Sequence, residues 1–115
     1  MGLRYISGSI VAGQTTSSRF ILGETNTPIG ITTGSNITGT KLSFLVSNDN
    51  ITYLPLYDAT STEVSLTVTT AARAYELEPL NTWAWRFMKV YAGVSASAVA
   101  QAVSTYFTII TKNIN

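Results

Sequence analysis

The 115-residue sequence contains neither cysteine nor histidine. Without cysteine there is no disulfide framework, and without either residue the usual ligands of zinc are missing. The thiolate and the imidazole that most nucleophilic and general acid–base catalysis requires are also absent. We therefore expect no enzymatic activity, no catalytic residues, no cofactor and no metal site.

Charged residues are scarce. They make up 11% of the chain, against roughly 25% in an average soluble domain. The seven lysines and arginines are scattered and the net charge is +1, so the basic patch that nucleic-acid binding requires is missing. Because so few charges do little to oppose association, we expect an oligomer or an assembly component whose surface is largely covered by partners.

Long apolar runs are absent as well. No segment approaches the roughly 18 apolar residues of a membrane span, and the first residues lack the apolar core of a signal peptide. We therefore expect neither membrane insertion nor export. A chain of this length fits one domain with one core.

The chain is rich in hydroxyl groups and in short β-type segments. Serine and threonine together supply 30 residues. Glu63–Thr69 alternates strictly, with its valines and leucine on one face, which is typical of a half-buried antiparallel strand. Lys41–Val46 shows the same pattern with Leu42, Phe44 and Val46 inward. Ser47–Asn50 then predicts a turn, and Ile51–Tyr57 predicts a returning arm that Pro55 restricts to an edge or a bulge.

The remaining segments complete an all-β architecture. Residues 92–103 are rich in alanine and fit either a short helix from Ser95 or an extended loop. Residues 1–12 are apolar but interrupted by glycine, and we expect an N-terminal arm that lies on a neighbour. Residues 13–115 are expected to form a single antiparallel β-sandwich or jelly-roll-like domain. Further strands are predicted at Arg4–Ile6, Arg19–Leu22, Ile29–Thr32, Arg73–Leu77, Trp85–Tyr91 and Thr105–Lys112.

Two groups of carboxylates have alternative interpretations. In an extended segment, Glu76 and Glu78 share one face and could belong to a calcium or glycosidase site, or they could be two solvated charges at a strand end. Asp49 and Asp58 flank the expected hairpin and could bind calcium together with backbone carbonyls, although no EF-hand spacing is present.

An aromatic cluster is the feature best suited to recognition. It consists of Trp83, Trp85, Phe87 and Tyr91. Exposed tryptophans stack on sugar rings, which would indicate a carbohydrate-binding module. The alternative places Trp85 and Phe87 in the core of the sandwich, with Trp83 covering its end.

Several segments between Ile37 and Lys112 resemble, in order and spacing, a family of small virion-associated proteins of tailed bacteriophages and prophages. The matching segments are Ile37–Phe44, Val46–Asp49 with Tyr53 and Leu56–Asp58, Glu63–Val68, Arg73–Pro79, Trp85–Val90 and Val99–Ala102. The sequence departs from this family at two turns, where Asn50 replaces a glycine and Ala98 replaces a proline.

The resemblance implies a β-sandwich on the outside of a virion, with no active site. It points to a capsid decoration or cement protein that stabilises the head by binding neighbouring subunits of the major capsid protein. For the oligomer we expect a homotrimer on local three-fold axes. The candidate partner-binding residues are Arg4, Tyr5, Ile6 and Trp83. The alternatives are a carbohydrate- or receptor-binding module of a tail fibre, and a minor tail or connector component.

Overall fold

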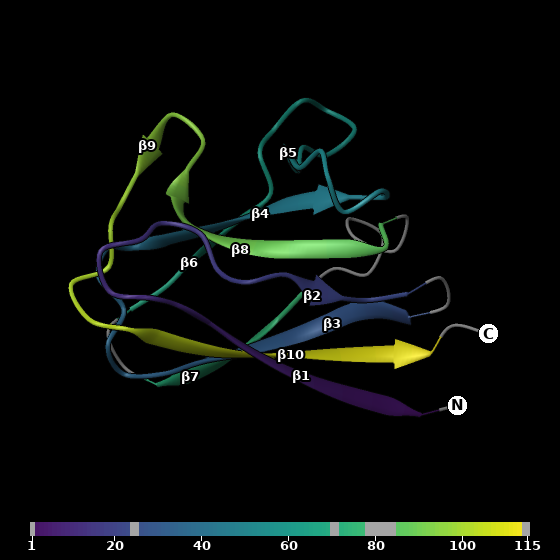
Figure 1. Ribbon diagram of the computed structural model, residues 1–115, viewed down its shortest axis with the longest axis horizontal. Coiled ribbons are helices and arrows are strands. Elements are labelled where there is room, and N and C mark those ends of the chain that lie inside the picture. Colours follow the sequence, from purple (N-terminus) through teal and green to yellow (C-terminus); the bar gives the residue numbers. More distant parts are fainter. Residues whose placement is uncertain (1, 24–25, 70–71, 78–84, 114–115) are drawn as a thin grey trace.

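The structure is a computed structural model that describes residues 2–23, 26–69, 72–77 and 85–113 (Figure 1). The described residues contain ten strands and no helix. The strands form two antiparallel sheets, which face each other as two layers (Figure 1). The prediction of an all-β sandwich is therefore confirmed.

The first layer, called sheet A, joins the two ends of the chain. Its strands are ordered β1-β10-β3-β7. Figure 1 shows β1 along the outer side of this layer. The bounds are Leu3–Ile10 for β1, Thr105–Asn113 for β10, Asn26–Thr33 for β3 and Arg73–Glu76 for β7.

The second layer, called sheet B, is built around the long antiparallel pair of β4 and β8. β2 flanks β8, β5 and β6 both pair with β4, and β9 folds back on β8 as a short hairpin. The bounds are Phe20–Ile21 for β2, Lys41–Ser47 for β4, Leu54–Pro55 for β5, Ser65–Thr67 for β6, Phe87–Val94 for β8 and Ser97–Ala98 for β9.

The core lies between the two layers and takes alternate residues from each strand. Large side chains from both sheets are fully buried in it, including Phe20, Phe44, Phe107, Ile31 and Met88. In β4 the predicted inward set is confirmed, because Leu42, Phe44 and Val46 are all buried. The alternation predicted around β6 also holds, since Val64, Leu66 and Val68 are covered while the intervening hydroxyl residues are exposed.

The interpretation that places Trp85 and Phe87 in the core is wrong for Phe87. Met88 and Val90 enter the core, whereas Phe87 projects to the opposite face and is only half-buried. Trp85, which precedes the strand, is half-buried and packs against the core as expected. Both faces of β8 carry large apolar side chains, so its alternation fixes a strand but leaves its inner face undetermined.

The alanine-rich segment is extended and forms no helix. β8 continues to Val94, turns, and returns as β9. Gly93 makes this possible, since its φ is +93° and a Cβ there would lie 2.2 Å from the Ser97 carbonyl oxygen. A left-handed residue at this position ends the strand pair in a way that a helix propensity scale does not foresee.

The segment predicted as an arm joins its own chain's sheet. Over Leu3–Ile10 it pairs with β10 along its whole length. Ile10 is fully buried, and Ile6 packs against the core. Contact of this segment with a neighbouring chain stays a prediction, and it would be made by an edge strand and not by a free arm.

Asn50 lies in a turn whose backbone conformation suits both asparagine and glycine. Asn50 has a φ of +60°, in the left-handed region that glycine and asparagine adopt most readily. Asparagine therefore meets the same backbone requirement as the glycine expected there.

Candidate interaction surface

The outer face of sheet A is a nearly uncharged surface of hydroxyl and aromatic groups. The pairing of β1 with β10 and of β10 with β3 places the side chains that point away from the core in rows across the sheet. The charged residues of this face that the structure describes stand at its margins, Lys112 on β10 and Glu76 on β7. Its uncharged members on β1, β3 and β10 are Leu3, Tyr5, Ser7, Ser9, Thr32, Tyr106, Thr108 and Ile110.

Two tyrosines dominate this face. Tyr5 is 68% exposed and Tyr106 is 66% exposed. Residues of β1, β10 and β3 line a shallow depression of about 560 Å³ that includes Tyr106 and the hydroxyls of Ser7, Thr32 and Thr108. Tyrosine combines a large apolar ring with a hydrogen-bonding tip and is enriched at protein interfaces. The face therefore has the composition of a contact surface.

The side edge of β1 exposes backbone hydrogen-bonding groups. Asn113 N–H donates to the Gly2 carbonyl at 3.1 Å, which shows that the polar groups of Gly2 point toward β10. Orientation alternates along an antiparallel strand, so those of Leu3, Tyr5 and Ser7 point away from β10. Ser9 also points away, and its carbonyl accepts from Ser18 N–H at 3.3 Å. Within the described ranges no backbone group bonds to the outward-pointing groups of Leu3, Tyr5 and Ser7, so the open part of the edge is Leu3–Ser7.

The candidate residues Arg4, Tyr5 and Ile6 all lie within this segment. Arg4 and Tyr5 are exposed, and Ile6 is half-buried against the core. Arg4 and Tyr5 are therefore the members of the set that are available for contact. Trp83, the fourth candidate, lies outside the described residues.

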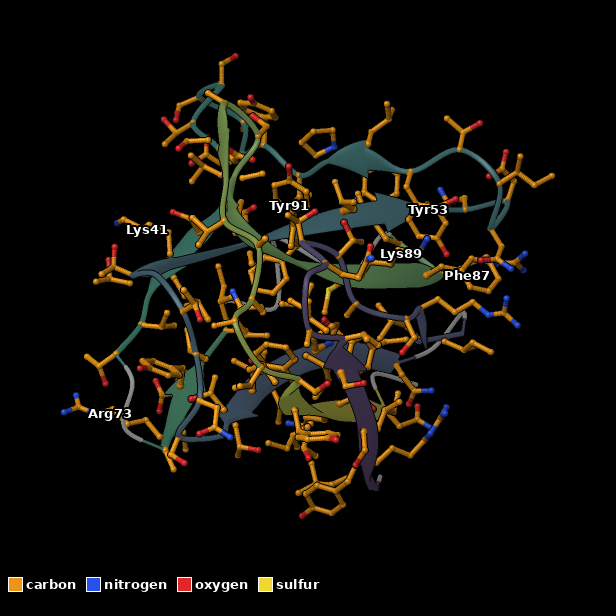
Figure 2. All side chains as sticks on the ribbon, turned by 60° about the vertical axis from the view of Figure 1, so that its left-hand side comes forward. Lys41, Tyr53, Arg73, Phe87, Lys89 and Tyr91 are labelled. Carbon is orange, nitrogen blue, oxygen red and sulfur yellow. The ribbon has the colours of Figure 1, made fainter. Side chains whose placement is uncertain are left out.

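The outer face of sheet B carries aromatic rings and a cation. Lys89 Nζ lies 4.3 Å from the centroid of the Tyr53 ring, in cation–π geometry. Figure 2 shows Phe87, Lys89 and Tyr91 along β8 with Tyr53 beside Lys89. Burial raises the pKa of the Tyr53 hydroxyl, which donates to Asn50 Oδ1. The contact between the ring and the cation holds residues 48–53, the loop between β4 and β5 that we call the Asp49 loop, against the sheet.

The carboxylates proposed as calcium ligands are engaged in their own loops. Asp49 Oδ1 accepts from the N–H groups of Ile51 and Thr52, both at 2.9 Å, and from the Ser47 hydroxyl. These bonds, led by that from Ile51, hold the pKa of Asp49 below its usual value. Among the residues that the structure describes, no group of three acidic side chains lies close enough to hold a metal ion.

Asp58 caps the next loop in the same manner. Its Oδ1 accepts from the Thr60 hydroxyl at 2.7 Å and from the N–H groups of Thr60 and Thr62. The hydroxyl bond is the main cause that lowers the pKa of Asp58. Glu76 is exposed on β7, and Glu78, its predicted companion, lies outside the described residues.

In the described part of the chain, no helix has the length and apolar character of a membrane span.

The sequence did not identify Tyr106 or the open edge of β1 as parts of one surface. The alternation of Tyr106 and Thr108 with Phe107 and Ile109 would have placed Tyr106 on an outer face. Its place on the same face as Tyr5, however, depends on a strand pairing that joins residues about 100 positions apart. Local patterns carry no signal for such a pairing.

Comparison with known proteins gives distant structural similarities. No family model and no curated protein sequence matches the chain. The SPBc2 prophage-derived protein YomS superposes with a TM-score of 0.49 at 12% identity, covering 96% of this chain and 95% of that chain. A chain of the cyanophage Pam1 capsid asymmetric unit superposes with a TM-score of 0.34 at 14% identity, covering 95% and 83%. These similarities are too distant to transfer a function.

Proposed function

We propose that the chain is a non-enzymatic structural protein of a tailed-phage particle that decorates the outer surface of the capsid and stabilises the head. The observation that carries the proposal is the outer face of sheet A, which exposes Tyr5 and Tyr106, contains a depression lined by Tyr106 and hydroxyl groups, and has its described charges only at the margins. The resemblance of Ile37–Lys112 to virion-associated proteins supports the same role.

Such a face suits a contact with a regular protein lattice. Tyrosine rings fill shallow pockets at little conformational cost, and neighbouring hydroxyls form hydrogen bonds without the desolvation cost of charges. Each contact is weak, but many copies on a symmetric shell act together. Because the subunit binds the assembled shell and not its separated proteins, binding shifts the equilibrium toward the intact shell.

The acidic side chains support a structural role. Asp49 and Asp58 organise their own turns, and Glu63 accepts hydrogen bonds from Ser95. These carboxylates are therefore occupied in holding loops together.

The decisive experiment is the copy number of this chain relative to the major capsid protein in purified particles of the encoding phage or prophage, measured by quantitative mass spectrometry. A ratio near one, or a simple fraction such as one-third, is expected for a decoration protein. A handful of copies would favour a tail or connector component. Complete absence would overturn the virion role and favour the glycan-binding module.

The contact face is tested by adding the purified protein to particles prepared without it. Tyr106→Ser should weaken binding by roughly tenfold or more, because it truncates an aromatic anchor. Ile51→Ser is the matched control, since Ile51 is 84% exposed but lies in the Asp49 loop of sheet B. Equal binding by both variants would show that another face contacts the shell.

A further inference from the structure

We propose that two copies of this chain associate through their β1 edges, which joins their A sheets into one continuous eight-stranded antiparallel sheet. The open backbone groups of Leu3, Tyr5 and Ser7 are the observation that leads to this pairing. It concerns the free protein in solution and goes beyond capsid binding.

β1 is less protected than the other described edge strands. Proteins protect sheet edges with short strands, prolines, lysines or bulges. β2, β5, β6 and β9 are only two or three residues long, and β7 is four residues long and carries Arg73 and Glu76. β1 is eight residues long, contains no proline and a single charged residue, Arg4, and pairs with β10 in an unbroken register. Of the described edges, it is the one suited to accept another strand.

The open positions are self-complementary. In an antiparallel pair with a two-fold axis at Tyr5, Tyr5 stands opposite Tyr5 of the second copy and Leu3 stands opposite Ser7. All the open positions then form hydrogen-bonded pairs, with about six N–H···O bonds in total. A two-fold axis at Ser7 would instead require the Ser9 carbonyl, which already accepts from Ser18. The edge therefore favours the axis at Tyr5.

Side chains agree with this register. The exposed Tyr5 rings meet as a cross-strand aromatic pair on the outer face. Arg4, the only charged residue of β1, stands opposite Ile6 of the second copy and not opposite another arginine. A second copy is thus accommodated without a directly opposed pair of like charges. The outer faces of the two A sheets become continuous, so the proposed capsid-binding surface doubles. This two-fold pairing replaces the trimer expected from the sequence.

Sedimentation equilibrium of the full chain tests the pairing. We expect a reversible monomer–dimer equilibrium of the 12.4 kDa chain. Tyr5→Pro removes an N–H that points away from β10, so it blocks the edge while leaving the β10 ladder intact. The variant should raise the dissociation constant at least about tenfold, with an unchanged circular dichroism spectrum. A wild-type chain that stays monomeric, or forms trimers, would overturn the proposal.

The matched control is Ala74→Pro on the opposite edge of sheet A. Leu77 N–H donates to the Ile29 carbonyl, so by alternation the Ala74 N–H also points away from its neighbouring strand. This variant should dimerise like the wild type. If Ala74→Pro dissociates the dimer as strongly as Tyr5→Pro, the strands pair head to tail, β1 with β7, and the two-fold arrangement is wrong.

Cysteine cross-linking tests the register, because the wild-type chain has no cysteine. Paired Tyr5 Cα atoms would lie roughly 5.5 Å apart, within the range for a disulfide. Tyr5→Cys should therefore give a covalent dimer on oxidation. Two copies of Ser7 would be offset by about four residues, roughly 14 Å, so Ser7→Cys should not cross-link. The opposite result would place the axis at Ser7. Because these measurements use the free protein, they can fail while capsid binding succeeds.

Discussion

The Gln101 side chain pairs with the backbone of Thr38 as a strand would. Its Nε2 donates to the Thr38 carbonyl at 2.9 Å, and its Oε1 accepts from Thr38 N–H at 2.9 Å. Oε1 also accepts from the Thr105 hydroxyl at 3.1 Å. Gln101 is 2% exposed, so this buried amide satisfies a loop that has no strand partner at that point.

Gln101→Ala should destabilise the fold by about 2–4 kcal/mol, because it leaves buried backbone groups of Thr38 without partners. Urea denaturation followed by tryptophan fluorescence measures the change. Gln14→Ala is the matched control, since Gln14 is exposed and its loss should cost less than about 0.5 kcal/mol. Similar costs for the two variants would mean that water replaces the Gln101 amide.

Gly8 is required by the ring of Phe20. A Cβ on Gly8 would lie 2.6 Å from Phe20 Cζ, and Phe20 is fully buried, so the ring has no space to move into. Gly8→Ala should cost about 1–3 kcal/mol in unfolding free energy, whereas Gly2→Ala, with no atom within 4 Å, should be nearly neutral.

A second substitution checks the cause. In a Phe20→Leu background, which shortens the opposing side chain, Gly8→Ala should cost clearly less than in the wild type. An additive pair of costs would mean that the Phe20 ring is not what excludes a Cβ at position 8.

Elements whose two faces differ could be predicted from the sequence. β4 alternates Leu42, Phe44 and Val46 with positions that, apart from Leu45, are polar, so both the strand and its inner face follow from the period of two. On β8, Phe87 and Tyr91 alternate with Met88 and Val90, and both sets are apolar. Periodicity fixes a strand there, but only the opposing sheet decides which set is buried.

The interaction surface was less accessible to sequence reasoning. Arg4 and Tyr5 were identified from composition, but the segment was predicted as an arm. Its pairing with β10 depends on the rest of the sandwich, because an apolar segment with glycines is compatible with both an arm and an edge strand. Tyr5 and Tyr106 lie on one face only through that long-range pairing.

Stability should fall in acid through Asp49 and Asp58. Folding lowers the pKa of both carboxyls, so the unfolded chain binds protons more readily than the folded chain. Their contribution is therefore present above the usual value of 3.8 and is lost as the pH falls through the lowered pKa values. Chemical denaturation between about pH 6 and pH 2 should show this decline.

The Asp49→Asn/Asp58→Asn variant isolates the two carboxyls. Its stability should depend less on pH in this range than that of the wild type, because asparagine keeps an acceptor oxygen but does not titrate. Glu76→Gln removes a charge at an exposed position of β7 and serves as the charge control. An equally steep decline in the Asn variant would assign the acid sensitivity to other groups.

Glu63 fixes the turn between β8 and β9. Each of its carboxylate oxygens accepts from Ser95 N–H at 3.1 Å, and Oε1 also accepts from the Ser95 hydroxyl. Tyr57 forms an isolated antiparallel β-bridge with Glu63. Its hydroxyl lies 3.3 Å from the Ser95 hydroxyl. The Glu63 carboxylate thereby joins the loop between β5 and β6 to the turn between β8 and β9.

Glu63→Ala should release this turn without unfolding the sandwich, because the contact is exposed and the core does not depend on it. Amide hydrogen exchange at Ser95 should accelerate by roughly tenfold or more, while the global unfolding free energy changes by less than about 1 kcal/mol. Glu63→Gln keeps one acceptor oxygen, so its exchange rate at Ser95 should fall between those of the wild type and Glu63→Ala. If exchange at Ser95 stays slow in Glu63→Ala, the pairing of Gly93 with Ala98 is sufficient to hold the turn, and the carboxylate does not protect the Ser95 amide.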